Sequence, residues 1–216
     1  MIIAIDGPAA AGKGTLARRL AAHFGLAYLD TGKLYRAVAL MVLGAGKDPA
    51  DPQAAEAAAR ALRAEALGDP ALREERVGAA ASVVAAHPGV RAALLDFQRR
   101  FARNPPGGAR GAVLDGRDIG TVIAPEPDVV KLFVHADLET RALRRLRELR
   151  ERGGNAIYSN VLQDMKERDA RDAGRGIAAL KKAPDALDLD TSNLDADQAF
   201  AKAVSFVESR SRDGGP

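Results

Sequence analysis

The segment Gly7–Thr15, with the sequence GPAAAGKGT, most constrains what this chain can fold into. It follows the apolar run Ile2–Ile5 and precedes a stretch, residues 16–24, with apolar side chains at helical spacing. A strand, a glycine-rich turn and a helix in this order bind phosphate, because backbone N–H groups and the helix N-terminus point at the anion. Lys13 is expected to reach the outer phosphates. The Thr15 hydroxyl is expected to bind a magnesium ion.

This segment departs from the usual phosphate-binding pattern at one position. The usual motif places Ser or Thr directly after the lysine, whereas here Gly14 follows the lysine and the hydroxyl comes next. A glycine turn with an incidental lysine is the alternative, but the flanking strand, helix and hydroxyl favour phosphate binding. The residues expected around the donor phosphates are Gly7, Pro8, Ala9, Ala10, Ala11, Gly12, Lys13, Gly14 and Thr15.

Length and composition restrict the class of protein. The 216 residues suffice for one domain with insertions, and 47% of them are hydrophobic. The lack of cysteine excludes disulfides and thiolate metal sites. A net charge of +3 and an aromatic content of 4% argue against a surface built for nucleic acid. Because the sequence shows no signal peptide and no apolar run of membrane-spanning length, we expect a cytoplasmic protein without a membrane partner.

Short apolar segments alternate with longer segments of helical pattern, which predicts an α/β fold with a mainly parallel sheet. The expected strands are Ile2–Ile5, Ala27–Leu29, Ala112–Leu114, Val129–Val134 and Ala186–Leu189. Ligands of such sheets bind at the carboxyl ends of the strands. The polar residues that follow these strands are Asp6, Asp30 with Thr31, Asp115 to Asp118, and Asp190 with Thr191.

The long segment between the second and third expected strands has the pattern of helices. A cap at Asp51 begins a helix that is expected to run to about Leu67. A second helix is expected over roughly Leu72–Ala86, and a third carries Val90 on its apolar face and stops at Asn104. The segment is therefore predicted to be a helical insert in the α/β fold.

Four segments together resemble the bacterial cytidylate kinases: GPAAAGKGT at 7–15, DTGKLYR at 30–36, DGRDIGT at 115–121 and ERDARDAGR at 167–175. The stretch 80–91 is also similar to this family. The resemblance implies a single domain with a three-layer α/β/α P-loop fold around a five-stranded, mainly parallel sheet. Its parts would be a core of residues 1–34, 109–148 and 176–208, a helical acceptor-binding insert at about 35–108 and a short lid at about 149–175.

The resemblance implies acceptor-binding roles for four residues in the first half of the chain. Thr31 and Arg36 match a hydroxyl and an arginine that contact the acceptor nucleotide, the arginine at its phosphate. Ser82 and Arg91 match residues placed against the pyrimidine ring. From the residues alone, Thr31 could instead cap the following helix, Ser82 could be an unremarkable helix residue, and Arg91 could be an ordinary solvated one. Many family members carry a small β-sheet before the serine, whereas Leu67–Val77 shows no strand alternation.

The DGRDIGT segment follows an expected strand and supplies three further candidates. Asp115 is implied to lie near magnesium, like the acidic residue of other P-loop enzymes. Arg117 would neutralise the acceptor phosphate, and Asp118 would accept a hydrogen bond from the exocyclic amine of cytosine. The alternative is an ion pair of the arginine with either carboxylate inside the turn.

The ERDARDAGR segment is dense in charge, and on a helix its residues 168, 171, 172 and 175 share one face. The resemblance assigns Arg168 and Asp172 to the ribose and Arg175 to the acceptor phosphate, and it makes Arg171 a candidate for the transferring group. A salt-bridged, solvent-exposed helix is the alternative. The preceding glycines at 153–154 indicate a hinge for a moving lid.

Together these matches imply an enzyme that transfers the γ-phosphoryl group of ATP to CMP, and also to dCMP, with Mg²⁺. Lys13, Arg117 and Arg171 would be its catalytic residues. We expect a monomer whose partners are nucleotides and not nucleic acid. Another small-molecule kinase, acting on UMP, AMP or shikimate, stays open as an alternative. A nucleotide-dependent switch is a second, although the guanine motif Asn-Lys-x-Asp does not occur, and a basic nucleic-acid-binding protein is a third.

Overall fold

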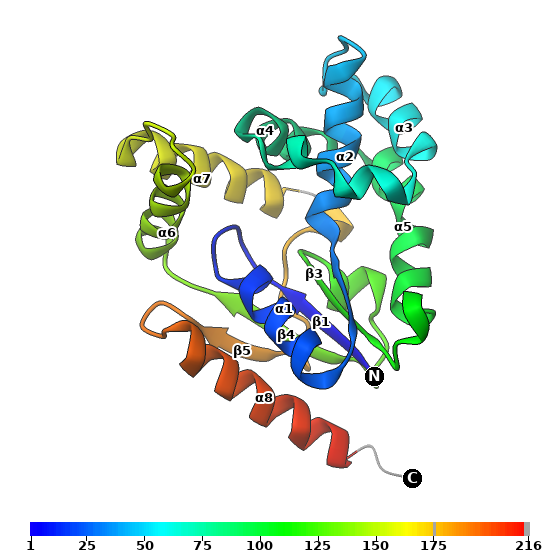
Figure 1. Cartoon of the computed structure of the whole chain (residues 1–216), viewed down its shortest axis with the longest axis vertical. Coiled ribbons are helices and arrows are strands. Elements are labelled where there is room, and N and C mark those ends of the chain that lie inside the picture. The colour runs from blue at the N-terminus through cyan, green and yellow to red at the C-terminus, as the bar shows by residue number, and fades with distance from the viewer. Residues whose placement is uncertain (175, 214–216) are drawn as a thin grey trace. The chain divides into compact units, whose positions relative to one another are not determined.

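The computed structural model describes residues 1–174 and 176–213 and contains a five-stranded sheet (Figure 1). The sheet has the order β2-β3-β1-β4-β5; β1 pairs in parallel with β3 and β4, and β4 pairs in parallel with β5. The expected strands and the α/β fold are thereby confirmed. The strands are β1 (Ile2–Asp6), β2 (Ala27–Asp30), β3 (Ala112–Gly116), β4 (Val130–His135) and β5 (Leu187–Asp190).

The chain divides into two compact units. Unit 1 comprises Met1–Leu29 and Ala102–Pro216, and unit 2 comprises Asp30–Phe101. The described helices of unit 1 include α1 (Lys13–Phe24), α6 (Leu138–Glu151), α7 (Tyr158–Ala173) and α8 (Ala196–Asp213). Unit 2 contains α2 (Thr31–Gly44), α3 (Pro52–Ala61), α4 (Glu75–Val84) and most of α5 (Pro88–Arg103).

One face of the sheet is covered by α1 and α8, which run beside the strands in Figure 1. Side chains of a strand alternate between the two faces, so Ile3 and Ile5 of β1 point to the same side. Both are fully buried in a cluster with Leu20 of α1 and Val207 of α8. Apolar burial of this kind is the main source of stability for the sheet–helix interface.

The helices α6 and α7 of unit 1 pack against each other as a hairpin. Their shared apolar cluster includes Leu146 of α6 and Met165 of α7. The side chain of Asp137 caps α6 by accepting a hydrogen bond from the Thr140 N–H at 2.6 Å. After α6 the chain turns at Gly153, whose φ of 82° lies in the left-handed region that favours glycine.

Two helix limits predicted in unit 2 are wrong. The first helix ends at Ala61, not Leu67, because Leu62 adopts an extended conformation; a separate 3₁₀ turn, η1, covers Ala64–Gly68. The second predicted helix also splits, since a 3₁₀ turn, η2 (Pro70–Arg73), precedes α4. Alanine-rich sequence favours helix throughout this region, so the pattern alone does not reveal the breaks.

The third predicted helix of the insert is present as α5. Its residues Val90 and Leu94 are buried with Val38 of α2 and Val77 of α4, which forms the apolar core of unit 2. Among the described residues, no single helix has the length and apolar composition to cross a membrane. The pair Glu75–Val84 and Pro88–Gly108 meets those criteria only when taken together across a 100° bend.

Candidate active site

The phosphate loop, residues 7–15, leaves β1 and enters α1 in the predicted strand–turn–helix context. A Cβ at Gly7 would lie 1.9 Å from the Val134 carbonyl oxygen, so only glycine permits the loop to pass this close to β4. Gly12 is the N-cap residue of α1, with φ of 89°, and no side chain caps the helix there. The helix N-terminus is thus directed into the loop, the arrangement that favours an anion. Ala10 also takes a positive φ, 59°, which costs an L-residue stability.

Lys13 lies at the first position of α1 and is only 6% exposed. Its Nζ donates a hydrogen bond to the Pro8 carbonyl oxygen at 2.8 Å, inside the phosphate loop. Burial, and next the positive charge of Arg117, lower the pKa of Lys13 to about 7. A polyphosphate at this position would oppose both effects, because a nearby negative charge favours the protonated lysine.

Asp115, the carboxylate expected near magnesium, is buried at the end of β3. The Tyr28 hydroxyl of β2 donates a hydrogen bond to its Oδ2 at 3.1 Å. A Cβ at Gly14 would lie 3.3 Å from that oxygen and 3.8 Å from the tyrosine hydroxyl. The glycine that interrupts the usual motif therefore leaves room for the tyrosine–carboxylate pair. Thr15 is exposed in the first turn of α1.

Arg117 follows β3 and forms an ion pair with Asp172 of α7. Its Nε donates to Asp172 Oδ2 at 2.7 Å, and the carboxylate is 1% exposed. Although burial opposes the charge, the Asp172 carboxylate raises the pKa of Arg117. The exposed-helix alternative does not hold for Asp172. The carboxylate partner in this contact also comes from a distant helix, not from the turn that holds Asp115 and Asp118.

The other charged residues of the ERDARDAGR segment lie in different surroundings. Arg168 is half-buried on α7, whereas Arg171 is exposed and lies 3.9 Å from the Glu167 carboxylate one helical turn away. Asp169 binds a buried arginine of α6, Arg141. Arg175, predicted to bind the acceptor phosphate, lies outside the described residues.

Arg141 is a residue that the sequence did not single out. Its two terminal nitrogens donate to the Asp169 carboxylate oxygens at 3.1 and 2.7 Å. Its Nε donates to the Ala136 carbonyl at 2.9 Å, and Nη1 also lies 3.4 Å from the Ala9 carbonyl of the phosphate loop. Arg141 thus joins α6, α7 and the loop. No local signal separates it from the neighbouring arginines of the same helix.

Asp6 is a second missed residue, although its place at the end of β1 is a signal. The side chain is 5% exposed and accepts hydrogen bonds from the N–H groups of Ile119 and Gly120, at 2.7 and 2.8 Å. Burial, together with the Asp118 carboxylate, raises the pKa of Asp6 to about 7. Asp118 itself is buried, 4% exposed.

In unit 2, Thr31 and Arg36 lie on α2. Asp30 is the N-cap residue of this helix and Thr31 its first residue, so the capping alternative for Thr31 is wrong; its side chain is 3% exposed. Arg36 donates from Nη1 to the Leu72 carbonyl at 2.8 Å. A Cβ at Gly78 of α4 would lie 2.9 Å from each terminal nitrogen of Arg36. The lack of a side chain at Gly78 therefore leaves the space that the Arg36 guanidinium occupies against α4.

The two pyrimidine candidates also lie in unit 2. Ser82 is buried on α4, 3% exposed. The guanidinium of Arg91, on α5, lies 5.6 Å from the ring centroid of Tyr35, and its Nη1 is 3.4 Å from the Ala85 carbonyl. A cation over an aromatic face is favourable, so Arg91 has a defined orientation and is not an ordinary solvated residue.

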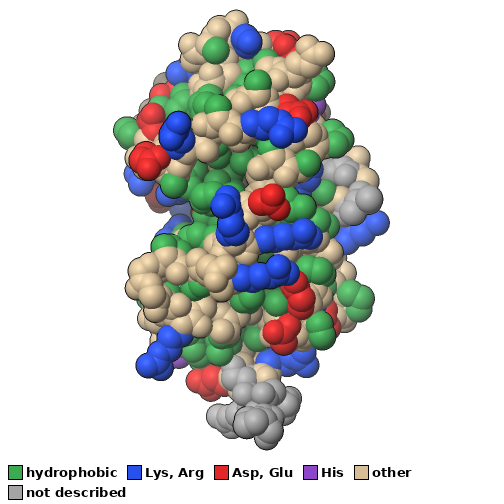
Figure 2. Space-filling view, turned by 90° about the vertical axis from the view of Figure 1, so that its right-hand side faces the viewer, with side chains coloured by type: hydrophobic (Ala, Val, Ile, Leu, Met, Phe, Trp, Pro, Cys, Tyr) green, Lys and Arg blue, Asp and Glu red, His purple; other side chains and the backbone are tan. Residues whose placement is uncertain are grey.

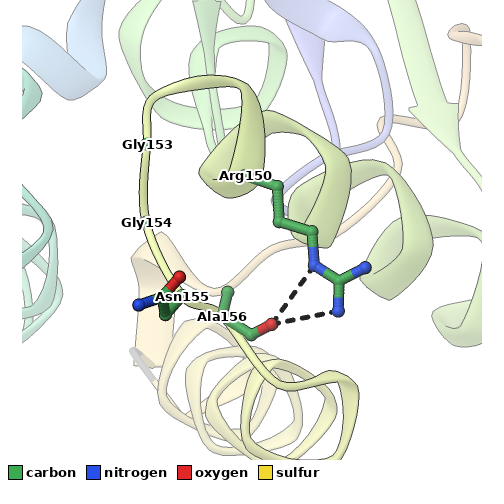
Figure 3. A pocket seen from close by; sticks show the side chains of 5 residues that line it. All are labelled: Arg150, Gly153, Gly154, Asn155 and Ala156. Atoms are coloured by element: carbon green, nitrogen blue, oxygen red, sulfur yellow. Dashed lines mark hydrogen bonds between the residues drawn. The ribbon is translucent and has the colours of Figure 1, made fainter.

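The turn between α6 and α7, expected as the lid hinge, lines a surface pocket (Figure 3). Arg150 spans it, with Nε and Nη2 donating to the Ala156 carbonyl at 3.3 and 3.2 Å. The N–H groups of Gly153 and Gly154 close the end of α6 by bonding the carbonyls of Arg150 and Leu149. That this turn acts as a hinge stays a prediction.

On the face drawn in Figure 2, Lys and Arg side chains lie next to Asp and Glu side chains. Two ion pairs at the C-terminal end of α6 show the same mixture: Arg145 pairs with Glu148 at 2.9 Å, and Arg152, which follows the helix, pairs with the same carboxylate. Charges of both signs are therefore interspersed, whereas a groove that tracks nucleic acid carries one sign.

A phosphate loop between the first strand and helix of a parallel sheet, with a buried lysine and an acidic strand end beside it, defines a P-loop nucleotide-binding protein. Residues 3–209 match the model of the cytidylate kinase family. The cytidylate kinase of Paramagnetospirillum magneticum is 63% identical over 209 residues, covering 97% of this chain and 98% of that protein. The cytidylate kinase of Rhodospirillum rubrum is 59% identical over 212 residues, covering 98% and 99%. The chain therefore belongs to the cytidylate kinase family of nucleoside monophosphate kinases, as its motifs predict.

A solved structure is also similar to this chain. The crystal structure of an uncharacterized protein from Eubacterium ventriosum aligns with a TM-score of 0.55 and 17% identity, covering 97% of this chain and 99% of that one. At this identity the likeness supports the fold alone.

Proposed function

We propose that this enzyme transfers the γ-phosphoryl group of ATP to the 5′-phosphate of CMP, giving ADP and CDP, and that dCMP is also an acceptor. The family match over residues 3–209 carries the proposal. An ionised phosphate oxygen of CMP is already a nucleophile at neutral pH, so the reaction needs no general base. Catalysis then depends on positioning the two nucleotides and on stabilising charge on the transferring group.

Lys13 and the amides of the phosphate loop are proposed to hold the donor phosphates. The support is the geometry of the loop, where the Lys13 Nζ donates a hydrogen bond to the Pro8 carbonyl. A phosphate oxygen would replace that carbonyl as the acceptor of the lysine hydrogen bond. Its negative charge would also favour the protonated lysine and so oppose the effects that lower the pKa of Lys13.

Thr15 and Asp115 are proposed to hold Mg²⁺. No group of three or more His, Cys, Asp or Glu that could bind a metal occurs within residues 1–174 and 176–213. A single buried carboxylate and a hydroxyl nevertheless fit this ion, which keeps several water ligands and shares substrate phosphates. When bound, Mg²⁺ supplies neutralisation of the donor phosphates. The Tyr28 hydroxyl, which donates a hydrogen bond to Asp115, would hold the carboxylate in place for this role.

Acceptor roles are proposed for residues of each unit on the strength of the family match. Arg36, Arg117 and Arg175 would neutralise the CMP phosphate, and Arg171 would meet the transferring group. Asp118 would accept from the cytosine amine. The remaining contacts are assigned to the nucleotide as follows: Thr31 to CMP, Ser82 and Arg91 to the pyrimidine ring, Arg168 and Asp172 to the ribose.

A coupled assay of ADP release with a panel of acceptors tests the proposal. CMP and dCMP should give turnover well above UMP, AMP and GMP, and ATP without acceptor should give little. Lys13→Ala should lower kcat by a hundredfold or more while circular dichroism stays unchanged. Lys202→Ala, an exposed lysine of α8, is the matched control and should keep wild-type turnover. Near-normal turnover of the Lys13 variant, or a preference for another acceptor, would contradict the proposed reaction.

A further inference from the structure

We infer that Asp6 is a positioning residue for Asp118, and through it for recognition of the cytosine base. The inference rests on the proposed function, because it takes Asp118 as the acceptor of the cytosine amine. Asp6 ends β1 directly before the phosphate loop and is almost fully buried. None of the steps above uses this carboxylate.

The direction of the Asp6 side chain follows from the alternation along β1. Ile3 and Ile5 point into the cluster formed with α1 and α8, so the next residue points to the opposite face of the sheet. There its two oxygens meet the start of a short π-helix, η4 (Ile119–Ile123). Oδ1 accepts from the Ile119 N–H at 2.7 Å and Oδ2 from the Gly120 N–H at 2.8 Å.

These contacts fix the peptide unit that follows Asp118. The N–H of that unit belongs to Ile119 and is held by Asp6. The C=O of the same unit, from Asp118, accepts the N–H groups of Val122 and Ile123 at 2.9 and 3.2 Å. Because a peptide unit is planar, holding it at both ends sets ψ of Asp118, which is 26°. The direction in which the Asp118 backbone presents its carboxylate therefore depends on Asp6.

A carboxylate suits this task better than its neutral analogue. Its two oxygens accept one N–H each, whereas asparagine would offer one acceptor and turn an NH₂ group toward the second N–H. A Cβ at Gly120 would make an ordinary contact with Oδ2, at 3.4 Å, and a tighter one with the Cγ and Cδ atoms of Lys131, at 3.2 Å. The charged groups around Asp6 include Lys13 and Arg117, which favour its anion, and Asp118, which opposes it. Forming the two backbone hydrogen bonds thus requires burial of a charged group, which is unfavourable by itself and is common at functional sites.

Asp6→Asn tests the inference. We expect KM for CMP to rise roughly tenfold, the effect of weakening one hydrogen bond to a charged group, with KM for ATP unchanged. The ratio of kcat/KM for CMP over UMP should fall by a similar factor, because UMP lacks the amine. Asp137→Asn, which alters the N-cap carboxylate of α6 in the same unit, is the matched control and should keep the wild-type ratio. A merely structural role of Asp6 would lower stability without moving the ratio.

The outcomes separate this inference from the proposed function. If the wild-type enzyme does not phosphorylate CMP, the proposed function fails. If it does, and Asp6→Asn keeps both the wild-type KM for CMP and the CMP/UMP ratio, the role of Asp6 is overturned. Should the variant not fold, amide hydrogen exchange of the wild-type protein decides. The Ile119 and Gly120 amides should be protected at least a hundredfold over their unstructured rates, and unprotected exchange at both refutes the contact.

Discussion

The buried ion pair of Arg141 with Asp169 should contribute far more stability than the exposed ion pairs of this enzyme. Two parallel hydrogen bonds join the guanidinium to both carboxylate oxygens, a fork geometry that is stronger than a single contact. The exposed fraction is 7% for the Arg141 side chain and 30% for that of Asp169. The same arginine bonds the Ala136 carbonyl, so its position is fixed independently of the partner.

The size of the coupling follows from the burial. Exposed ion pairs contribute about 0.2–1 kcal/mol, and removal of one partner from a buried pair costs about 3–5 kcal/mol. Because Asp169 is partly exposed whereas Arg141 is almost fully buried, we expect a coupling free energy between these two limits, about 1.5–2 kcal/mol. For a protein of this size, each 1 kcal/mol shifts Tm by about 2–4 °C. The pair should therefore account for roughly 3–8 °C of thermal stability.

A double-mutant cycle in urea measures this coupling, with Arg141→Met, Asp169→Ala and the double variant. The control is the Arg19–Asp197 pair, which has an N–O distance of 2.8 Å but 89% exposure of the Asp197 side chain. Its cycle should give at most about 0.5 kcal/mol and should shrink in 1 M salt, whereas the buried pair should keep most of its coupling. Equal coupling energies for the two pairs would refute the argument from burial.

Three further outcomes follow from close contacts and buried charge. Gly7→Ala should prevent nucleotide binding or folding, since its Cβ would overlap the Val134 carbonyl at 1.9 Å; soluble yield and a nucleotide titration check this. Gly78→Ala should displace the Arg36 guanidinium, 2.9 Å from the new Cβ, and raise KM for CMP several-fold while KM for ATP stays constant. The native state holds Lys13 with a pKa of about 7, below its ordinary value of 10.5, so it binds fewer protons than the unfolded chain between these values. The free energy of unfolding should thus gain from this residue as pH rises from 7 toward 10, a gain that urea titrations of Lys13→Met should lack.

The strands and the phosphate loop were predictable because their signals are local. Each strand is a short apolar run ended by a polar residue, and the loop is marked by glycines at fixed offsets. The helix limits at Ala61 and Glu75 were not predictable in the same way. Their surroundings are rich in alanine, which favours a continuous helix across both limits, whereas the structure breaks the helices at the extended residues Leu62 and Glu74.

Which residues form ion pairs within the site could not be predicted from local sequence patterns. Arg117 and Asp172 are 55 residues apart in sequence, and their contact depends on the packing of α7 in unit 1. The sequence offered carboxylates nearer to the arginine, and nothing in their spacing favoured the distant one. At Gly14 the sequence alone showed a departure from the usual motif. The structure explains this departure, because a Cβ at Gly14 would lie close to the Asp115 carboxylate.

Lys13 and Asp6 are two buried charged groups, each with a pKa shifted to about 7, and they interact with different partners. Burial disfavours the charge of both groups. A bound polyphosphate would relieve the penalty at Lys13, since it brings the negative charge that the lysine lacks. The same phosphate would raise the penalty at Asp6, which already has its partners in two backbone N–H groups. The charge of Lys13 is therefore matched by a bound phosphate, whereas the charge of Asp6 is matched by backbone N–H groups of its own protein. Substitution of Lys13 should weaken binding of the donor, and substitution of Asp6 should change the selectivity for the acceptor, although the two residues are close in sequence.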